Sequence, residues 1–177
     1  MKRNYLIELI GSSRLLAQHK SLEEGLRELA RLSANVLKVQ RCSIMLLTPA
    51  DQGEESDLRI YSYHGHLPAS ALQSSMPLSQ GIAGHVVRTG KPLFLDNVAE
   101  SKFANLARGA DHCDPSLICV PIRVADDLIG VANVSDPLPG RRLTKDDLEL
   151  VEVFAMFIGQ SMHTFQLQKL VESRLLQ

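Results

Sequence analysis

A glycine-rich stretch at residues 79–98, "SQGIAGHVVRTGKPLFLDNV", is the first candidate for chemistry. A phosphate-binding loop requires Gly, four residues, Gly-Lys and then Ser or Thr, whose hydroxyl holds magnesium. Here five residues separate Gly84 from Gly90, and Pro92 follows Lys91. A dinucleotide fingerprint is also missing, because only Gly81-x-x-Gly84 is present and it precedes its nearest strand. We therefore expect a tight helix start, a helix end at Gly90 and one wall of a cavity.

Histidine, cysteine and aspartate gather in two short segments. "YHGH" contains His64 and His66, and "DHCD" covers residues 111–114. Together they offer the nitrogen, sulfur and oxygen ligands of a metal site. Adjacent residues point in different directions on most backbones, so a polar turn accounts for "DHCD" better than a metal site does. His85, on the predicted short helix, would cap the helix or line a cavity.

No nucleophile with its base stands out in the sequence. Cys113 follows His112, but neighbours in sequence rarely form the hydrogen bond between nucleophile and base. No Gly-x-Ser-x-Gly elbow occurs. The acidic pairs at 126–127 and 146–147 are typical of a turn and of a helix N-terminus. The residues therefore favour a noncatalytic chain.

The composition limits the classes of protein. The chain has 177 residues, enough for one domain, and its formal net charge of −1 gives no basic excess for nucleic acid. Three cysteines form no zinc-ribbon spacing, and buried, reduced thiols are the simplest interpretation. No apolar run approaches the ~20 residues of a membrane span, and no signal peptide is evident. We expect a cytoplasmic protein.

Helices and strands alternate along the chain in the order α–α–β–β–α–β–β–β–α. Ser21 and Glu24 form a capping box for the second helix, and Thr144 and Asp147 form one for the last. The predicted helices are 2–18, the one starting at 21, 81–90 and the one starting at 144; the predicted strands are 42–49, 58–64, 91–96, 116–124 and 128–135. A mostly antiparallel sheet with helices follows from this order.

The last helix carries two apolar stripes. One is a heptad seam, with steps of 3, 4, 3, 4 and 3, and an adjacent stripe runs beside it. Because a surface helix needs only one apolar stripe, the seam predicts a partner helix, and Ile158 is expected at a dimer interface. The seam residues are Leu148, Val151, Ala155, Ile158, Met162 and Phe165, and the second stripe is Leu150, Phe154, Phe157 and Ser161.

The order of motifs resembles the GAF domain family. The resemblance covers residues 21–166, and its carriers are "RCSIMLL", "QGIAGHVVRTGKPLFLDNV", "SLICVPI", "LIGVANV" and "LTKDDLELV". It implies an α+β, profilin-like fold with a six-stranded antiparallel sheet sandwiched between helices. Residues 1–20 would be an N-terminal dimerisation or signalling helix, and residues 167–177 a C-terminal helix extension.

The resemblance also implies positions that contact a small-molecule ligand. Ser43 matches a ligand-contacting serine, and Ile82 and Ala83 match backbone contacts at a helix start. Tyr63 and His64 fall where the family places an aromatic and an acidic residue. The remaining candidates close the site from the strand end and the lid of residues 97–116: Asp96, Phe103, His112 and Cys113.

The chain matches the motifs of three family branches to different extents. The "QGIAGHV" run is similar to cyclic-nucleotide GAF domains. Of their Asn-Lys, Phe, Asp-Glu signature, however, only Asp147 is present, because Asp136-Pro137, Leu143 and Leu148 stand at the other four positions. The Asp-Ile-Pro environment of bilin-binding domains is absent. Cys113 is similar to the lid cysteine of free methionine sulfoxide reductases, whose other cysteines have no counterpart here.

The resemblance thus implies a noncatalytic sensory domain that binds an unidentified small molecule and needs no cofactor or metal. It would act as a homodimer through its N- and C-terminal helices and signal to an output domain or partner, whether standalone or part of a longer protein. Two alternatives stay open: a methionine sulfoxide reductase using Cys113, and a dimerisation module without ligand.

Overall fold

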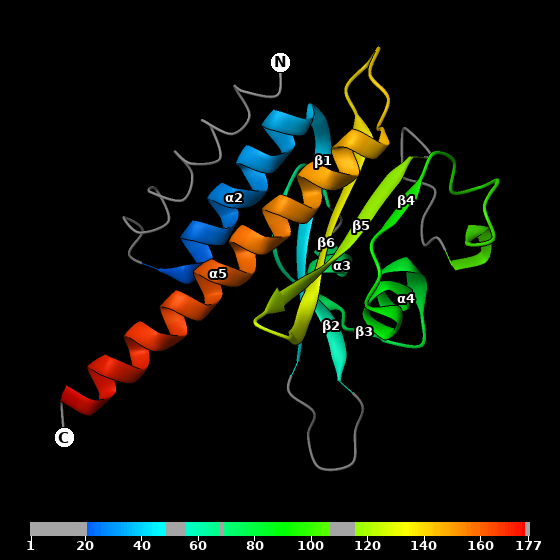
Figure 1. The fold of residues 1–177 in the computed structure, drawn as a ribbon. Coiled ribbons are helices and arrows are strands. Elements are labelled where there is room, and N and C mark those ends of the chain that lie inside the picture. The colour runs from blue at the N-terminus through cyan, green and yellow to red at the C-terminus, as the bar shows by residue number, and fades with distance from the viewer. Residues whose placement is uncertain (1–20, 49–55, 68, 107–115, 176–177) are drawn as a thin grey trace.

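A six-stranded antiparallel sheet organises residues 21–48, 56–67, 69–106 and 116–175, which are the residues that the computed structural model describes (Figure 1). The strand order is β3-β2-β1-β6-β5-β4. The strands are β1 (Val39–Leu47), β2 (Asp57–His64), β3 (Met76–Pro77), β4 (Leu93–Leu95), β5 (Leu117–Val124) and β6 (Asp127–Pro137). The helices are α2 (Leu22–Leu37), α3 (Ala69–Gln73), α4 (Gly81–Thr89), the 3-10 helix η1 (Ala104–Leu106) and α5 (Lys145–Leu175). The predicted fold class is confirmed.

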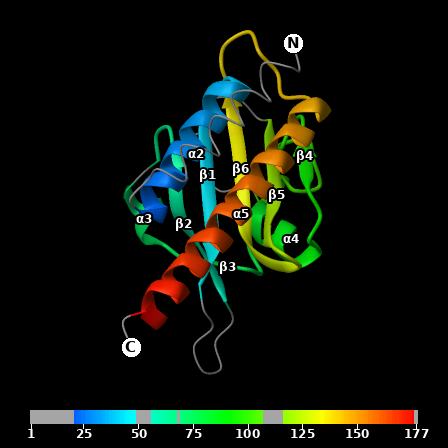
Figure 2. The same cartoon turned by 60° about the vertical axis from the view of Figure 1, so that its left-hand side comes forward.

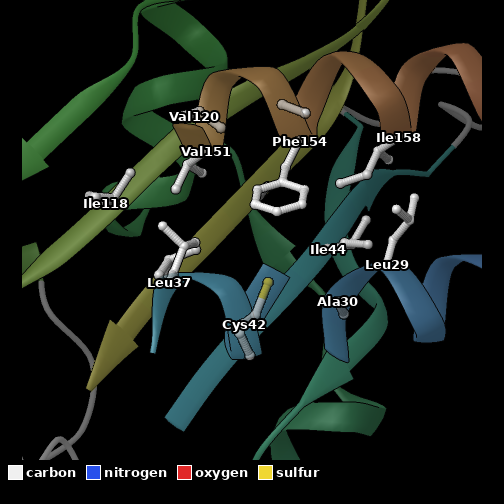
Figure 3. Close-up of a cluster of buried hydrophobic side chains, with 14 of the residues drawn as sticks. Leu29, Ala30, Leu37, Cys42, Ile44, Ile118, Val120, Val151, Phe154 and Ile158 are labelled. Carbon is white, nitrogen blue, oxygen red and sulfur yellow. The ribbon is translucent and has the colours of Figure 1, made fainter. Parts of the chain in front are cut away.

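Helices α2 and α5 cross the same face of the sheet (Figure 2). Their apolar side chains meet those of β1, β5 and β6 in the larger of two cores. Phe154 of α5, 2% exposed, lies at its centre, between strand residues such as Ile44 and Ile118 and helix residues such as Leu29 (Figure 3). We call this the helix face.

Local signals at the ends of these helices are confirmed. The Ser21 hydroxyl accepts a hydrogen bond from the Glu24 N–H at 3.2 Å. At α5 the box is reciprocal: the Thr144 N–H donates to Asp147 Oδ2 at 2.8 Å, and the Asp147 N–H donates to Thr144 Oγ1 at 3.4 Å. Each cap satisfies N–H groups that would otherwise have no partner within the helix.

The heptad seam of α5 has a different partner from the predicted one. Val151, Ala155, Ile158 and Met162 are all at most 9% exposed and lie in the helix-face core of their own chain. Phe154, from the second stripe, enters the same core. Both stripes therefore pack within the domain, and the expectation that Ile158 lies at a dimer interface is wrong. The sheet and α2 together offer a wider apolar surface than a single stripe can cover.

The opposite face of the sheet is covered by α4 and carries the smaller core. Its buried residues are Leu58, Ile82, Ala83, Val86, Leu95, Phe103, Cys119 and Val131. We call this the α4 face. The predicted helix 81–90 is confirmed as α4, which ends at Gly90 in a left-handed conformation (φ 61°), with the Gly90 N–H donating to Val86 O at 2.8 Å.

Several element boundaries differ from the predicted ones. Strand β1 begins at Val39 because Lys38 takes a left-handed conformation (φ 53°) that turns the chain directly out of α2. The β5–β6 turn uses Ala125 (φ 51°) and Asp126, so Asp127 already pairs with Val124. Strand β3 was not predicted, β4 is shorter than predicted and β6 longer. The predicted helix 2–18 lies outside the described residues.

Candidate functional site

One row of side chains crosses the α4 face from strand to strand. Tyr63 of β2 lies opposite Ser43 of β1, Ser43 lies opposite Asn133 of β6, and Asn133 lies opposite Cys119 of β5. Directly paired residues in an antiparallel sheet project from the same face. The row reaches the smaller core, to which Cys119 belongs. We call Tyr63, Ser43, Asn133 and Cys119 the polar row.

The centre of the polar row is a hydrogen bond between two of its members. Asn133 Nδ2 donates to Ser43 Oγ at 3.4 Å, and both side chains are partly buried. A hydroxyl and an amide retain further donor and acceptor capacity after one mutual bond. The surrounding residues are apolar, including Met45 and Val131 on neighbouring rows. A few polar groups in an apolar setting are typical of small-molecule sites.

Asn133 was not among the sequence candidates. The segment "LIGVANVS" was interpreted only as a strand, although Asn133 is its one amide among apolar residues. Strand alternation puts Asn133 on the same face as Val131 and therefore toward α4. An amide on the buried face of a strand was the available signal.

The start of α4 packs against the core of the α4 face. Ile82 and Ala83 are 8% and 6% exposed and belong to the α4-face core. Gly81 has a positive φ of 69°, which glycine adopts without strain. A Cβ at Gly84 would lie 2.4 Å from Leu78 O, so only glycine allows this close backbone approach. The glycine pair is thus a packing device, as the spacing predicted.

Phe103 and Asp96 lie in different surroundings. Phe103 is 5% exposed in the α4-face core, and its ring meets His85 of α4 edge-on at 4.8 Å between centroids. Lys102 Nζ stands 5.2 Å from the Phe103 ring centroid. Asp96 follows β4 and is exposed. The structure therefore brings Phe103 to the α4 face and leaves Asp96 at its border.

His64 is separated from the other candidates by the register of β2. It lies opposite Cys42, whose side chain is in the helix-face core, while its neighbour Tyr63 lies opposite Ser43. Successive side chains of a strand point to opposite faces, so His64 belongs to the helix face. His112 and Cys113 lie outside the described residues, as do the other residues of "DHCD".

An ion pair occupies the next row of the sheet, beyond Ser43. Arg41 lies opposite Ser135, and Arg41 Nε stands 3.2 Å from Asp136 Oδ2. The Asp136 side chain is 3% exposed, and Ser135 Oγ donates to the same carboxylate oxygen at 3.4 Å. Asp136 has a left-handed backbone (φ 55°). In the sequence, Asp136 stood out only as a departure from a signature.

The thiols described by the structure are unsuited to nucleophilic chemistry. Burial raises the pKa of the Cys42 thiol to about 12 and raises the pKa of the Cys119 thiol further. A thiolate is the reactive species, so both groups stay protonated at neutral pH. Within residues 21–48, 56–67, 69–106 and 116–175, no three His, Cys, Asp or Glu side chains gather closely enough to hold a metal ion. No helix in those ranges is long and apolar enough to cross a membrane.

Comparison with protein families gives a match to the GAF domain over residues 21–162. Among curated proteins, the chain is 29% identical over 163 residues to the Nif-specific regulatory protein of Azospirillum lipoferum, covering 88% of this chain and 25% of that protein. It is 26% identical over 175 residues to the dual 3',5'-cyclic-AMP and -GMP phosphodiesterase 11 of Drosophila melanogaster, covering 92% of this chain and 12% of that protein. The chain therefore spans a minor part of both relatives.

Solved structures share the fold. The GAF domain of an Acinetobacter phosphoenolpyruvate-protein phosphotransferase superposes with a TM-score of 0.77 at 20% identity, covering 93% of this chain and 95% of that one. The free methionine-R-sulfoxide reductase of Neisseria meningitidis, solved with its substrate, superposes with a TM-score of 0.71 at 15% identity, covering 90% and 88%. A domain of a phosphotransferase and a free methionine-R-sulfoxide reductase therefore share this architecture, and the fold alone does not decide the function.

Proposed function

The chain belongs to the GAF domain family, and from this premise we propose that it is a noncatalytic sensory domain that binds a small molecule on the α4 face. Its likeness to parts of a Nif-specific regulatory protein and of a phosphodiesterase supports a sensory role. The ligand would bias the long helix α5, which in this proposal passes the change to an output domain or partner. A ligand exerts this effect only when it binds two arrangements with different affinity.

The polar row is the observation that carries the proposal. Ser43 and Asn133 place a hydroxyl and an amide on the sheet floor, amid apolar side chains, with Tyr63 on the next strand. The start of α4 faces the same core, where Ile82 and Ala83 are buried. His64, on the other face, is not part of this proposed site.

Cyclic nucleotides are not the ligand class that we favour. Both acidic residues at the signature places are held by arginines of the same chain: Asp136 by Arg41, and Asp147 by Arg141 at 2.7 Å. Asp147 also caps α5. These contacts give each carboxylate a structural role in the domain. Cyclic nucleotides therefore enter a screen as one class among others.

A thermal-shift screen tests the proposal. Cyclic nucleotides, amino acids, 2-oxo acids and nitrate are each added at millimolar concentration. A ligand at 100 times its Kd stabilises the folded state by about 2.7 kcal/mol. The shift should vanish in Asn133→Leu and persist in Val134→Ala, the adjacent residue whose side chain lies in the helix-face core. A flat screen would favour a dimerisation module without ligand. A shift that Asn133→Leu leaves intact would mean that the compound binds elsewhere on the domain, and it would count against this site.

The proposal includes a homodimer that uses α5. Large apolar side chains on its outer surface are exposed: Met156 at 71%, Leu167 at 50%, Leu170 at 49% and Val171 at 56%. Met156 and Leu167 are eleven residues apart, about three helical turns, and therefore share one side of the helix. Figure 1 shows the C-terminal part of α5 extending beyond the sheet. A second copy of α5 would cover this stripe. Residues 1–20, the other predicted dimer element, lie outside the described residues.

Sedimentation velocity tests the dimer. Leu167→Glu places a charge in the exposed stripe and should shift the protein toward monomer. Gln166→Glu is the matched control, because it adds the same charge at the neighbouring exposed position. If both variants remain dimeric, α5 is not the interface.

The enzymatic alternative depends on Cys113. The two described thiols, Cys42 and Cys119, are buried and protonated, so neither offers a nucleophile. We infer that the domain is not an enzyme. Activity toward free methionine sulfoxide that disappears in Cys113→Ser would overturn this inference. A cytoplasmic location stays a prediction of the sequence.

A further inference from the structure

A signal from the α4 face must cross the sheet, because α5 lies on the other side. This inference rests on the proposed function for the identity of the two faces. Arg123, near the end of β5, contacts α4 through its side chain and α5 through its backbone. Its position on the exposed end of the strand makes it a connection between elements of both faces.

The guanidinium of Arg123 lies against the C-terminal end of α4. Arg123 Nη2 donates to Gly90 O at 3.5 Å, and Nη1 donates to Asp126 O in the β5–β6 turn at 3.0 Å. The contact with Gly90 is also steric: a Cβ at Gly90 would lie 2.7 Å from Arg123 Nη2. A movement of the Gly90 cap therefore displaces the guanidinium, which is tied to the turn.

The backbone of the same residue touches α5. A Cβ at Gly159 would lie 1.9 Å from Arg123 O, so the helix approaches the strand where it has no side chain. The pairing of β5 with β6 shifts register between Ile122 and Arg123. Such an irregularity redirects backbone groups and breaks the regular ladder. With backbone directly against backbone, a shift of the carbonyl is passed to the helix without a flexible side chain between them.

We propose that Arg123 is the positioning residue that couples the C-terminal cap of α4 to the Gly159 turn of α5. The Arg123 guanidinium contacts the Gly90 cap, and the Arg123 carbonyl, at the register shift, contacts α5. Arg123 touches both helices from one position in the sheet, so its side chain sets how far a displacement of α4 reaches α5. The coupling is a property of the folded chain and exists without ligand.

Hydrogen exchange in a double-mutant cycle tests the coupling. Gly90→Asn disturbs the cap while keeping a residue that tolerates the left-handed conformation, and its Cβ pushes on the end of a flexible side chain. Arg123→Met removes the donors and keeps an unbranched apolar stem. Arg59→Met, at an exposed arginine on β2, is the matched control for losing an arginine. Exchange is followed at residues 156–162 of α5, at residues 86–89 of α4 and in β1.

In the wild-type and Arg59→Met backgrounds, Gly90→Asn should speed exchange at 156–162 by about fivefold, the effect of one lost hydrogen bond. In Arg123→Met, the same change should speed exchange at 86–89 but leave 156–162 unchanged. Unaltered exchange in β1 confirms that the sheet is intact; if it rises, Arg123→Lys replaces Arg123→Met and should retain part of the response. An equal α5 response with and without Arg123, or none in either, overturns the proposal. Because no ligand is added, this result is independent of the ligand screen.

Discussion

The same strands carry two adjacent rows of side chains with opposite character. On the α4 face the row is Tyr63, Ser43, Asn133 and Cys119; on the helix face, one residue along each strand, it is His64, Cys42, Val134 and Ile118. Apart from His64 at the edge, the helix-face row is apolar and enters the larger core. The polar row interrupts the smaller core with hydrogen-bonding groups. A shift of one residue along each strand thus separates an apolar row from a polar one.

This difference indicates how the domain divides its free energy. The helix face contains most of the buried apolar residues, so it should dominate the free energy of unfolding. Partly buried polar groups contribute little stability when they bond to each other, and they lower it when they lose a partner. The polar side chains on the α4 face are therefore not the ones that would give the domain its highest free energy of unfolding. Substitutions chosen from the two faces test this division.

The largest effect is expected at the centre of the helix face. Phe154→Ala removes a side chain that is 2% exposed and should lower the free energy of unfolding by about 3–5 kcal/mol. Phe103→Ala is the counterpart in the smaller core of the α4 face, where the ring borders His85 and Lys102, and it should cost less. Urea unfolding measures both. Equal losses of unfolding free energy would show that the two cores contribute equally to stability.

A smaller and sharper contrast comes from neighbouring residues of β6. Val134→Ala removes two buried methyl groups from the helix face and should cost about 2 kcal/mol. Asn133→Leu replaces an amide on the α4 face by an apolar side chain and should change stability by less than about 1 kcal/mol in either direction. The midpoints of urea unfolding, compared at a constant m-value, show which of the two substitutions costs more stability. If Asn133→Leu is the more damaging change, Asn133 is a structural residue.

The smallest effect depends on pH. Burial favours protonated Asp147, but hydrogen bonds from Arg141 and Thr144 outweigh it and lower the pKa of Asp147 below its ordinary value. A carboxylate with a lowered pKa stabilises the fold above its unfolded pKa and loses that contribution as pH falls below about 4. Asp147→Asn should therefore cost about 1 kcal/mol at pH 7 and much less at pH 3.

Thermal unfolding across this pH range, with Glu149→Gln as an exposed control on the same helix, measures the difference. A constant gap between wild type and Asp147→Asn at all pH values would mean that the carboxylate charge is unimportant. The cap would then act only through its shape.

Local signals allowed the sequence to predict much of the fold. The caps at Ser21 and Thr144 and the end of α4 at Gly90 depend on nearby residues alone, and the structure confirms them. The seam around Ile158 was predicted to meet a partner helix, but it packs in the core of its own chain, because tertiary packing decides which surface covers an apolar stripe. Strand β3 has two residues and leaves almost no pattern.

The candidate site was harder to predict for the same reason. A family resemblance supplied five candidate positions, and the structure puts all five on the α4 face: Ser43, Tyr63, Ile82, Ala83 and Phe103. His64 lies on the helix face, since a shift of one residue along a strand exchanges the faces. Asn133 was missed because its importance arises from pairing with Ser43, ninety residues away in the sequence.

The central claim is that the α4 face is the ligand face, and a crystal structure with the best compound from the screen tests it most directly. The account predicts ligand atoms within hydrogen-bonding distance of Ser43 Oγ or Asn133 Nδ2, with the start of α4 at Ile82 alongside. A compound bound instead against α2 or α5, with Ser43 and Asn133 still paired only to each other, would contradict it.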